Sequence, residues 1–194
     1  MPVEIEAKMK VHSLSDIRVK LLDCGAKPAG EVMETNVFFD TEDRSLLAAD
    51  KGLRLRHKKD VAGGKESFVI TYKGPRKQGP LKNREENELT VGNDKDAIRL
   101  LESIGFTRVL SFQKRRESWK LKDCLVELDE LPHLGVFVEI EGPKEDAVLE
   151  VRQILGMQDE PIVKASYIAM LMTHLQEHGI TGKTVTFPAT AAKP

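Results

Sequence analysis

Residues 3–11 read VEIEAKMKV and alternate strictly between apolar and charged side chains. Side chains at positions i and i+2 of an extended chain point the same way, so Glu4, Glu6, Lys8 and Lys10 share one face. The opposite face is entirely apolar. This pattern predicts a β-strand that buries its apolar face and presents charges of both signs on the other.

The same alternation recurs over much of the chain. We expect further strands at residues 35–41, 52–59, 67–73, 84–91, 107–121, 125–131 and 136–141. Their charged faces carry Arg54, Arg56, Lys73, Arg84, Glu86, Glu88, Lys114, Arg116, Glu127, Asp129, Glu139 and Glu141. A single strand of this kind usually turns its charged face to solvent. So many of them, with acids and bases both clustered, indicate an enclosed charged surface.

Helices are expected at residues 13–24, 94–104, 144–155 and 162–177, with a helical turn within residues 43–50. These amphipathic helices can cover the apolar strand faces. An antiparallel sheet of eight strands can close on itself and so lose its edges. We therefore predict an α+β fold: a closed eight-stranded antiparallel β-barrel with a charged interior and helices packed outside. We assign residues 1–180 to this domain and residues 181–194 to a flexible C-terminal tail.

A charged barrel interior has to contain water and charged ligands, because an unpaired buried charge costs several kcal/mol. The basic residues suit an anion with many oxygens, since arginine binds phosphate oxygens in pairs and lysine acts as a point charge. The acidic residues suit hard divalent cations such as Mg²⁺ or Mn²⁺. A polyphosphate with its metal ion satisfies both sets of side chains at once.

The bulk composition excludes several classes of partner. The 194 residues include 30 basic and 31 acidic side chains and carry a net charge of −1, which gives no general attraction to nucleic acid or membrane. No apolar run approaches the roughly 18 residues of a membrane span, and the charged N-terminal segment is unlike a secretory signal. We therefore expect a cytoplasmic protein. In it, Cys24 and Cys124 are expected to be free, buried thiols.

Several motifs together resemble the CYTH superfamily, the triphosphate tunnel metalloenzymes. The E-x-E-x-K signature of that family stands here as Glu4-Ile5-Glu6-Ala7-Lys8. Supporting matches within residues 3–175 are LRLR (53–56), TYKGP (71–75), REE (84–86), KRR (114–116), DE (129–130), LGVFVEIE (134–141) and SY (166–167). The KGP and LGVFVEIE stretches are most similar to the class IV adenylyl cyclase branch.

The resemblance implies a cofactor and a set of site residues. Mg²⁺ or Mn²⁺ is the implied cofactor, and its ligands would be Glu4, Glu6, Asp129, Glu139 and Glu141. The triphosphate would be bound by Lys8, Arg54, Arg56, Lys73, Arg84, Lys114 and Arg116. The residues expected to act in the reaction itself are Lys8, Glu6 and Arg56.

The feature shared by the family is the triphosphate rather than one reaction. The branch similarity favours conversion of ATP to cyclic AMP and pyrophosphate. Hydrolysis of inorganic triphosphate, thiamine triphosphate or a nucleoside triphosphate is the alternative. A non-catalytic polyphosphate-binding module would not need so many carboxylates, and RNA 5′-end processing would call for a basic stripe with aromatic residues. We expect a small-molecule triphosphate substrate and neither a membrane nor a nucleic-acid partner, and we leave a homodimer open.

Other signals are weaker. Gly182-Lys183-Thr184 resembles the end of a phosphate-binding loop, but Glu177 stands where that loop requires its first glycine. His174 and His178 lie four residues apart at a helix end, where a solvated or dipole-complementing role is expected. The basic segment 76–84 is either a solvated surface or a flexible lid over the phosphates. The pair at 166–167 either packs its helix or anchors it to the barrel mouth.

Overall fold

The computed structural model describes the backbone of residues 3–188 and the side chains of residues 5–188. Along the chain, its elements are β1 (Val3–Val11), α1 (Leu14–Asp23), β2 (Lys27–Asp40), α2 (Ser45–Ala48), β3 (Gly52–Asp60), β4 (Glu66–Lys73), β5 (Lys82–Val91), α3 (Asp94–Ser103), β6 (Thr107–Leu121), β7 (Cys124–Leu131), β8 (Gly135–Gly142), α4 (Glu145–Ile154), α5 (Tyr167–Glu177) and β9 (Thr184–Val185).

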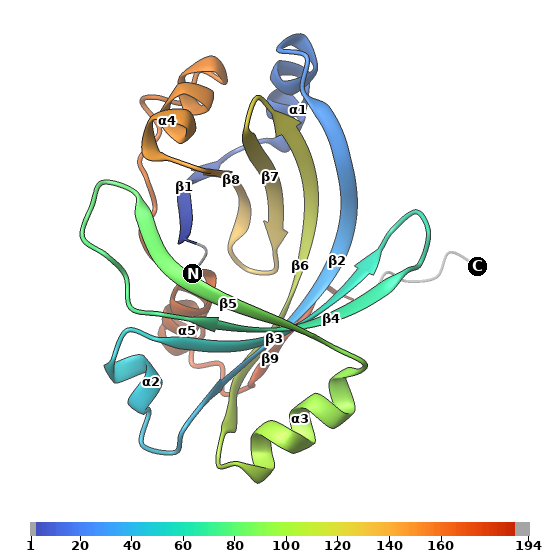
Figure 1. Cartoon of the computed structure of the whole chain (residues 1–194), viewed down its shortest axis with the longest axis vertical. Helices are drawn as coiled ribbons and strands as arrows, with labels where there is room; N and C mark the ends of the chain where they lie inside the picture. Colours follow the sequence, from blue (N-terminus) through green and yellow to red (C-terminus); the bar gives the residue numbers. More distant parts are fainter. Residues whose placement is uncertain (1–2, 189–194) are drawn as a thin grey trace.

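Eight antiparallel strands close into a barrel (Figure 1). Their order is β2-β3-β4-β5-β1-β8-β7-β6, and β6 pairs with β2 to complete the circle. The short β9 adds parallel to β6 at Ser111 and Phe112, a pairing that the sequence pattern did not indicate. The predicted α+β fold with a closed eight-stranded barrel is confirmed.

The two longest strands, β2 and β6, pair along almost their whole length, from Lys27 opposite Lys120 to Asp40 opposite Thr107. The sequence predicted β2 only from residue 35. Its first half contains Pro28 and Gly30, which weaken a strand pattern, and the register shifts between these two residues. Pairing with β6 therefore extends β2 toward its N-terminal end, past the part of the strand that the alternation of apolar and polar residues predicted.

Two apolar clusters cover the outside of the barrel. One joins α1 and α4 to β1, β6, β7 and β8, with Leu21 and Val148 fully buried. The other joins α2 and α3 to β2, β3 and β4, around Leu55 and Leu101. Figure 1 shows α1 and α4 at the top of the view and α2 and α3 at the bottom. The charged strand faces are therefore left to point inward, as predicted.

Helix α5 packs differently from the other helices. Its cluster contains Leu110 and Phe112 of β6, which share the alternation of the inward-facing Lys114. Phe137 of β8 is also in this cluster and shares the alternation of Glu139. Helix α5 thus packs against inward-facing apolar positions toward one end of the barrel, so that the charged interior gives way to an apolar region there.

Helix α5 begins at Tyr167, whereas the sequence predicted a helix from residue 162. Ile162 instead forms a β-bridge with Met9, and the Val163 N–H donates to the carbonyl of Lys8 at 2.7 Å. The hydroxyl of Ser166 then accepts from the N–H of Ala169 and caps the helix. Residues 162–166 form an extended strap along β1. Pairing with that strand provides backbone hydrogen bonds that a helical turn would otherwise provide.

The structure also bears on the predictions for the cysteines, for membrane-spanning segments and for the C-terminal tail. Both cysteines are free, and Cys124 is buried, but Cys24 is exposed because it lies at the C-terminal cap of α1 rather than on its buried face. Within the described residues, none of the helices is both long enough and apolar enough to cross a membrane. Of the predicted tail, residues 189–194 lie outside the described residues.

Candidate functional site

The inward-facing strand positions hold an unusual number of buried polar side chains. Those buried among the described residues are Glu6, Lys8, Glu34, Asn36, Asp40, Arg54, Thr71, Arg84, Lys114, Arg116, Glu127, Asp129 and Glu139. Charged residues are almost never buried unless they are paired. The interior should therefore contain ion pairs, and it does.

Arg116 on β6 is the centre of one buried network. Its guanidinium donates to both carboxylate oxygens of Asp129 on β7, each at 2.6 Å. It also forms ion pairs with Glu127 and Glu139. Burial opposes the charge of Arg116, but Asp129 and Glu127 hold its pKa well above the usual value. The pKa of Glu127 is raised by burial, against the attraction of Arg116.

Glu34 on β2 is the centre of a second network, and the sequence analysis missed it because residue 34 lay just outside the predicted strand. It is fully buried, 3.3 Å from Lys114 Nζ and 3.6 Å from Arg56 Nη1. Burial alone would raise the pKa of Glu34, but Lys114 and Arg56 hold it well below the usual value. Lys114 Nζ also lies 3.2 Å from Asp129, which connects the two networks.

Lys8 on β1 is held from three sides. Its ammonium donates to the carbonyl of Ala165 at 3.1 Å and lies 3.2 Å from a carboxylate oxygen of Glu139. The same nitrogen is 3.9 Å from the centre of the Tyr167 ring, a cation–π distance. Burial lowers the pKa of Lys8, partly offset by Glu139. The strap and the first turn of α5 thus fix the lysine of the E-x-E-x-K motif.

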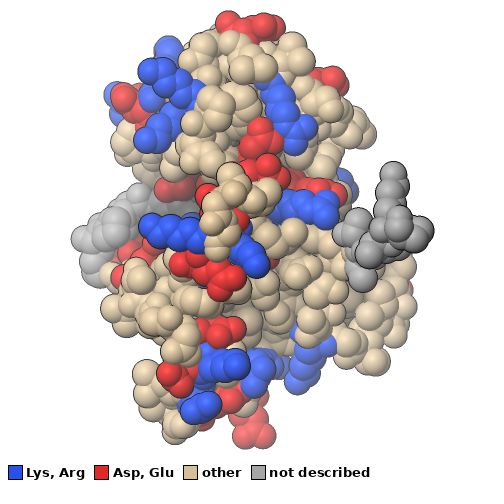
Figure 2. All heavy atoms as spheres, turned by 90° about the vertical axis from the view of Figure 1, so that its right-hand side faces the viewer, with Lys and Arg blue, Asp and Glu red and all other residues tan. Residues whose placement is uncertain are grey.

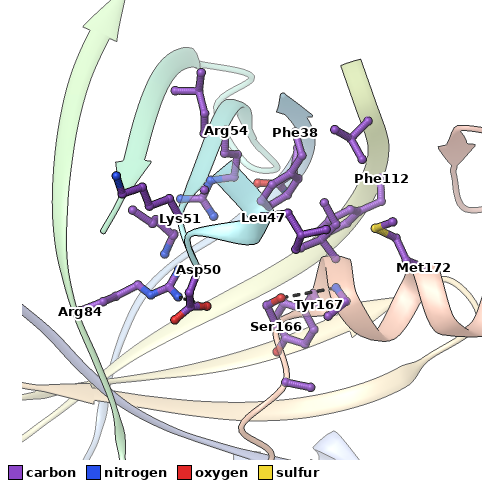
Figure 3. A pocket seen from close by; sticks show the side chains of 18 of the residues that line it. Phe38, Leu47, Asp50, Lys51, Arg54, Arg84, Phe112, Ser166, Tyr167 and Met172 are labelled. Carbon is purple, nitrogen blue, oxygen red and sulfur yellow. Dashed lines mark hydrogen bonds and ion pairs between the residues drawn. The ribbon is translucent and has the colours of Figure 1, made fainter. Parts of the chain in front are cut away.

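A cavity of about 360 Å³ lies among these residues. It is lined by every basic residue that was predicted to bind the triphosphate: Lys8, Arg54, Arg56, Lys73, Arg84, Lys114 and Arg116. These side chains come from β1, β3, β4, β5 and β6. Figure 3 shows Arg54 and Arg84 on the same side of this cavity as Lys51 and Asp50. The structure therefore brings the predicted basic set together around one space.

A family model for the CYTH domain matches residues 2–167. The chain belongs to the CYTH domain family. A Methanocaldococcus jannaschii protein named "Putative adenylate cyclase MJ0240" is 27% identical over 177 residues, which cover 87% of this chain and 98% of that protein. The predicted family is confirmed.

Solved structures share the fold of this CYTH domain. PH1819 of Pyrococcus horikoshii OT3 superimposes with a TM-score of 0.76 at 27% identity, over 88% of this chain and 99% of that one. A Hippeastrum protein, HpAC1, superimposes with a TM-score of 0.66 at 18% identity, over 90% of this chain and 96% of that one. HpAC1 is described as a "putative adenylyl cyclase" with a dominant triphosphatase activity.

The acidic residues of this CYTH domain face one another across neighbouring strands. Glu6 on β1 lies directly opposite Glu141 on β8, and Glu127 on β7 lies directly opposite Glu139 on β8. Like charges in such positions destabilise a sheet unless a cation neutralises them. Lys82 partly does so, since its ammonium lies 2.5 Å from Glu6. Hard carboxylate oxygens on adjacent strands also fit a divalent cation such as Mg²⁺.

Several of the predicted metal ligands are already paired with basic side chains among the described residues. Over the part of the chain with described side chains, no three acidic, histidine or cysteine groups gather closely enough to form a ready metal site. The side chain of Glu4 lies outside the described residues. Asp129 accepts from Arg116, Lys114 and Tyr167, so both of its oxygens are occupied. Glu139 is also paired through both oxygens, with Lys8 and with Arg116. Among the predicted ligands, Glu6, Glu139 and Glu141 lie on the directly paired strands β1 and β8, and this placement favours them for a shared cation, which would have to displace their present partners.

The basic loop between β4 and β5 is attached to the cavity rim. Asp50 has a left-handed backbone (φ 53°) and accepts from both the backbone and the side chain of Arg76. Arg84 lies 3.5 Å from the same carboxylate. Lys164 of the strap donates to the carbonyl of Gly79 at 3.3 Å. The sequence left segment 76–84 as either a solvated surface or a lid over the phosphates, and both remain predictions. Residues 75–80 are exposed, as a solvated surface would be, whereas Arg76, Lys82 and Arg84 line the cavity, as a lid would.

The weaker sequence signals have structural explanations. Thr184 lies in β9, so the Gly182-Lys183-Thr184 stretch does not open a helix as a phosphate-binding loop would. His174 and His178 stack near the end of α5, with His133 of the β7–β8 turn stacked against His174. The pair at 166–167 does anchor α5, because Ser166 caps it and Tyr167 enters the barrel.

Replacing Tyr167 with phenylalanine is expected to lower the free energy of unfolding by about 1.5–3 kcal/mol, because the Tyr167 hydroxyl donates to buried Asp129 at 2.9 Å. Urea denaturation measures the change. Tyr72→Phe is the matched control, since no hydrogen bond to a buried carboxylate is described for Tyr72, and it should change stability much less. Equal effects of the two variants would show that the bond to Asp129 contributes nothing.

Proposed function

We propose that this CYTH domain is a divalent-metal-dependent enzyme that binds a triphosphate in the barrel and catalyses its nucleotidyl or phosphoryl chemistry. The observation that carries the proposal is the cavity lined by basic side chains from five strands. Phosphoryl transfer depends mainly on positioning and on neutralising charge rather than on covalent help from the protein. A preformed basic cavity supplies both.

The reaction we favour is conversion of ATP to cyclic AMP and pyrophosphate, supported by the name of the M. jannaschii relative. The ribose 3′-hydroxyl attacks the α-phosphorus, a new O–P bond forms, and the bond from the α-phosphorus to the bridging oxygen breaks. The hydroxyl loses its proton and pyrophosphate leaves. Arg54, Arg56 and Lys114 would bind the triphosphate oxygens, and Lys8 would stabilise charge that develops during transfer.

The metal would be Mg²⁺ or Mn²⁺, held by Glu6, Glu139 and Glu141. When bound, such a cation withdraws negative charge from the phosphate oxygens and orients the triphosphate. The opposing pair of Glu6 and Glu141 supports this assignment, because two like charges face each other there. Lys82 and Lys8 pair with Glu6 and Glu139, so a cation bound there would share these carboxylates with the two lysines.

Hydrolysis of the triphosphate is the second candidate. It is supported by the description of the similarly folded Hippeastrum protein, in which triphosphatase activity dominates. In this reaction water attacks the terminal phosphorus and loses a proton, the bond from that phosphorus to the bridging oxygen breaks, and the remaining diphosphate leaves while phosphate is formed. The same basic side chains would neutralise the charge of the transferred group, so the two reactions would share the triphosphate-binding residues and differ in the nucleophile and in the phosphorus attacked.

A small-molecule substrate is favoured over a nucleic-acid strand. Figure 2 shows a face on which Lys and Arg side chains alternate with Asp and Glu side chains, without a continuous basic stripe. Strong nucleic-acid binding needs a clustered basic surface. The basic residues that cluster in this chain do so inside the barrel instead.

Product analysis tests the proposal. The protein is incubated with Mg²⁺ or Mn²⁺ and either ATP or inorganic triphosphate, and the products are separated by chromatography. Cyclic AMP with pyrophosphate is the expected result. ADP with phosphate would identify a triphosphatase instead. Absence of turnover with either substrate and either metal would contradict the proposed enzyme.

A further inference from the structure

Both ends of the short helix α2 have a left-handed backbone, which is uncommon for residues other than glycine. Arg44 precedes the helix with φ 62° and ψ 35°, and Asp50 follows it with φ 53°. Both residues line the cavity. In the described part of the chain the other non-glycine residues with positive φ, Lys122 and His133, lie in hairpin turns, where this conformation is common. A strained backbone outside a hairpin turn is typical of functional sites.

The conformation of Asp50 has an explanation within the protein, because its carboxylate accepts from Arg76 and lies 3.5 Å from Arg84. The conformation of Arg44 has no such explanation. Among the described residues, its side chain has no hydrogen-bond or ion-pair partner, and its Nη1 atom is buried. A buried donor without a partner destabilises a fold. Arg44 therefore carries two costs, in its backbone and in its side chain, that no contact of the folded chain offsets.

The position of α2 does not depend on the Arg44 side chain. Asp40 of β2 is buried and accepts from the backbone N–H groups of Leu46 at 2.9 Å and Leu47 at 3.1 Å. These bonds attach the helix to the barrel and use N–H groups that the first turn would otherwise leave unpaired. Figure 3 shows Leu47 and Asp50 of this segment beside the cavity. The Arg44 guanidinium is thus held close to the cavity by a segment that it does not itself stabilise.

We infer that Arg44 is a further substrate-binding residue, whose guanidinium turns toward the cavity and donates to oxygens of the phosphate chain. The inference rests on the proposed function, which places a triphosphate in this cavity. A guanidinium binds phosphate oxygens in pairs, so the contact would satisfy the nitrogen that has no partner in the folded chain. Arg44 lies outside the barrel strands, and the alternation of charged and apolar residues therefore gave no sign of it.

Arg44 differs from the basic residues that already line the barrel. Arg56 lies 3.6 Å from Glu34, and Lys8 lies 3.2 Å from Glu139. A phosphate chain has to compete with these carboxylates for the two cations. It meets no such competitor at Arg44, because no acidic partner of that side chain is present in the described part of the chain. We therefore expect Arg44 to contribute strongly to the affinity for the anion.

Binding measurements on Arg44→Met test the inference. Arg99→Met is the matched control: Arg99 lies on α3, its side chain is 77% exposed, and it does not line the cavity. Both variants lose one positive charge, so an effect of net charge alone would appear in both. Calorimetric titrations with inorganic triphosphate and with ATP are carried out in EDTA, which prevents metal-dependent turnover. Arg44→Met should bind both anions about 10- to 100-fold more weakly, and Arg99→Met should bind them as the wild type does.

Arg44→Gly separates a role in binding from a role in folding. Glycine adopts the left-handed conformation without the steric cost that a side chain imposes. This variant should therefore unfold at a urea concentration no lower than the wild type does, although it binds both anions as weakly as Arg44→Met. A markedly lower urea midpoint for both variants would show that the side chain serves the fold, and would overturn the inference.

The remaining outcomes distinguish this inference from the proposed function. Wild-type affinity of Arg44→Met for both anions would overturn the inference and leave the triphosphate site standing. Weaker binding of ATP with unchanged binding of inorganic triphosphate would also overturn it, since Arg44 would then contact the organic part of the ligand. Failure of the wild type to bind either anion in EDTA would overturn the inference, and failure with Mg²⁺ as well would overturn the proposed function.

Discussion

Replacing Arg116 with methionine is expected to lower the free energy of unfolding by about 3–5 kcal/mol at pH 7, because it removes the shared partner of three buried carboxylates. Asp129 would keep Lys114 and Tyr167, and Glu139 would keep Lys8. Methionine matches the length of the arginine stem but supplies no charge. Urea denaturation of the wild type and the variant measures the loss.

The neighbouring residue provides the control. Arg115 is the next residue of β6, points outward and pairs with Glu130 at 3.0 Å. Exposed ion pairs contribute little to stability, so Arg115→Met should change the free energy of unfolding by no more than about 0.5 kcal/mol. If both variants lost the same stability, the buried network would not be what holds β6, β7 and β8 together.

A pH series distinguishes lost charge from lost packing in Arg116→Met. Burial raises the pKa of Glu127 in the folded protein, and loss of Arg116 removes the attraction that opposes this rise. A group whose folded pKa is raised above its unfolded value stabilises the fold at low pH, and that contribution is lost as pH rises through the folded pKa. The deficit of the variant should therefore narrow as pH falls through the raised folded pKa of Glu127 toward the usual glutamate pKa of 4.5, below which Glu127 is protonated in both the folded and the unfolded protein. A packing defect would stay constant with pH.

The fold could be predicted from the sequence because one physical requirement determines it. Alternation at a period of two places Lys8, Arg56, Lys114 and Glu139 on the faces opposite the apolar residues, and helices were available to cover the apolar faces. Once the sheet closes, those charges have only the interior to occupy. Residue type and odd or even position along a strand can both be read from the local sequence, so the basic lining of the cavity could be predicted from them.

The parts that could not be predicted depend on contacts between distant segments. Glu34 enters the site because β6 pairs with a segment of β2 whose own sequence, interrupted by Pro28 and Gly30, lacks alternation. The strap at 162–166 is extended because it pairs with β1, although its sequence is compatible with a helix. Likewise, which basic residue pairs with which acidic residue is set by the barrel geometry rather than by spacing along the chain, as the ion pair between Lys82 and Glu6 shows.

Replacing Glu6 with glutamine is expected to lower turnover by about 100- to 1,000-fold while the protein stays folded, because the change removes a charge that the reaction uses and keeps the side-chain volume. Glu6 is 5% exposed and directly opposite Glu141, on the strand that also carries Lys8. Glutamine can still accept a hydrogen bond from Lys82, so the fold loses little. Initial rates at saturating ATP, measured over a range of Mg²⁺ concentrations, test this.

The dependence on Mg²⁺ separates a metal ligand from a structural acid. If Glu6 helps to hold the cation, the Mg²⁺ concentration that gives half-maximal activity should rise in Glu6→Gln, whereas ATP binding in EDTA should be no weaker. Glu130→Gln makes the same chemical change on the outward face, where Glu130 pairs with Arg115, and should leave both quantities as in the wild type. Wild-type turnover by Glu6→Gln would remove the E-x-E-x-K motif from the reaction. A lower rate with an unchanged Mg²⁺ concentration at half-maximal activity would instead indicate that Glu6 orients Lys82 and the phosphates.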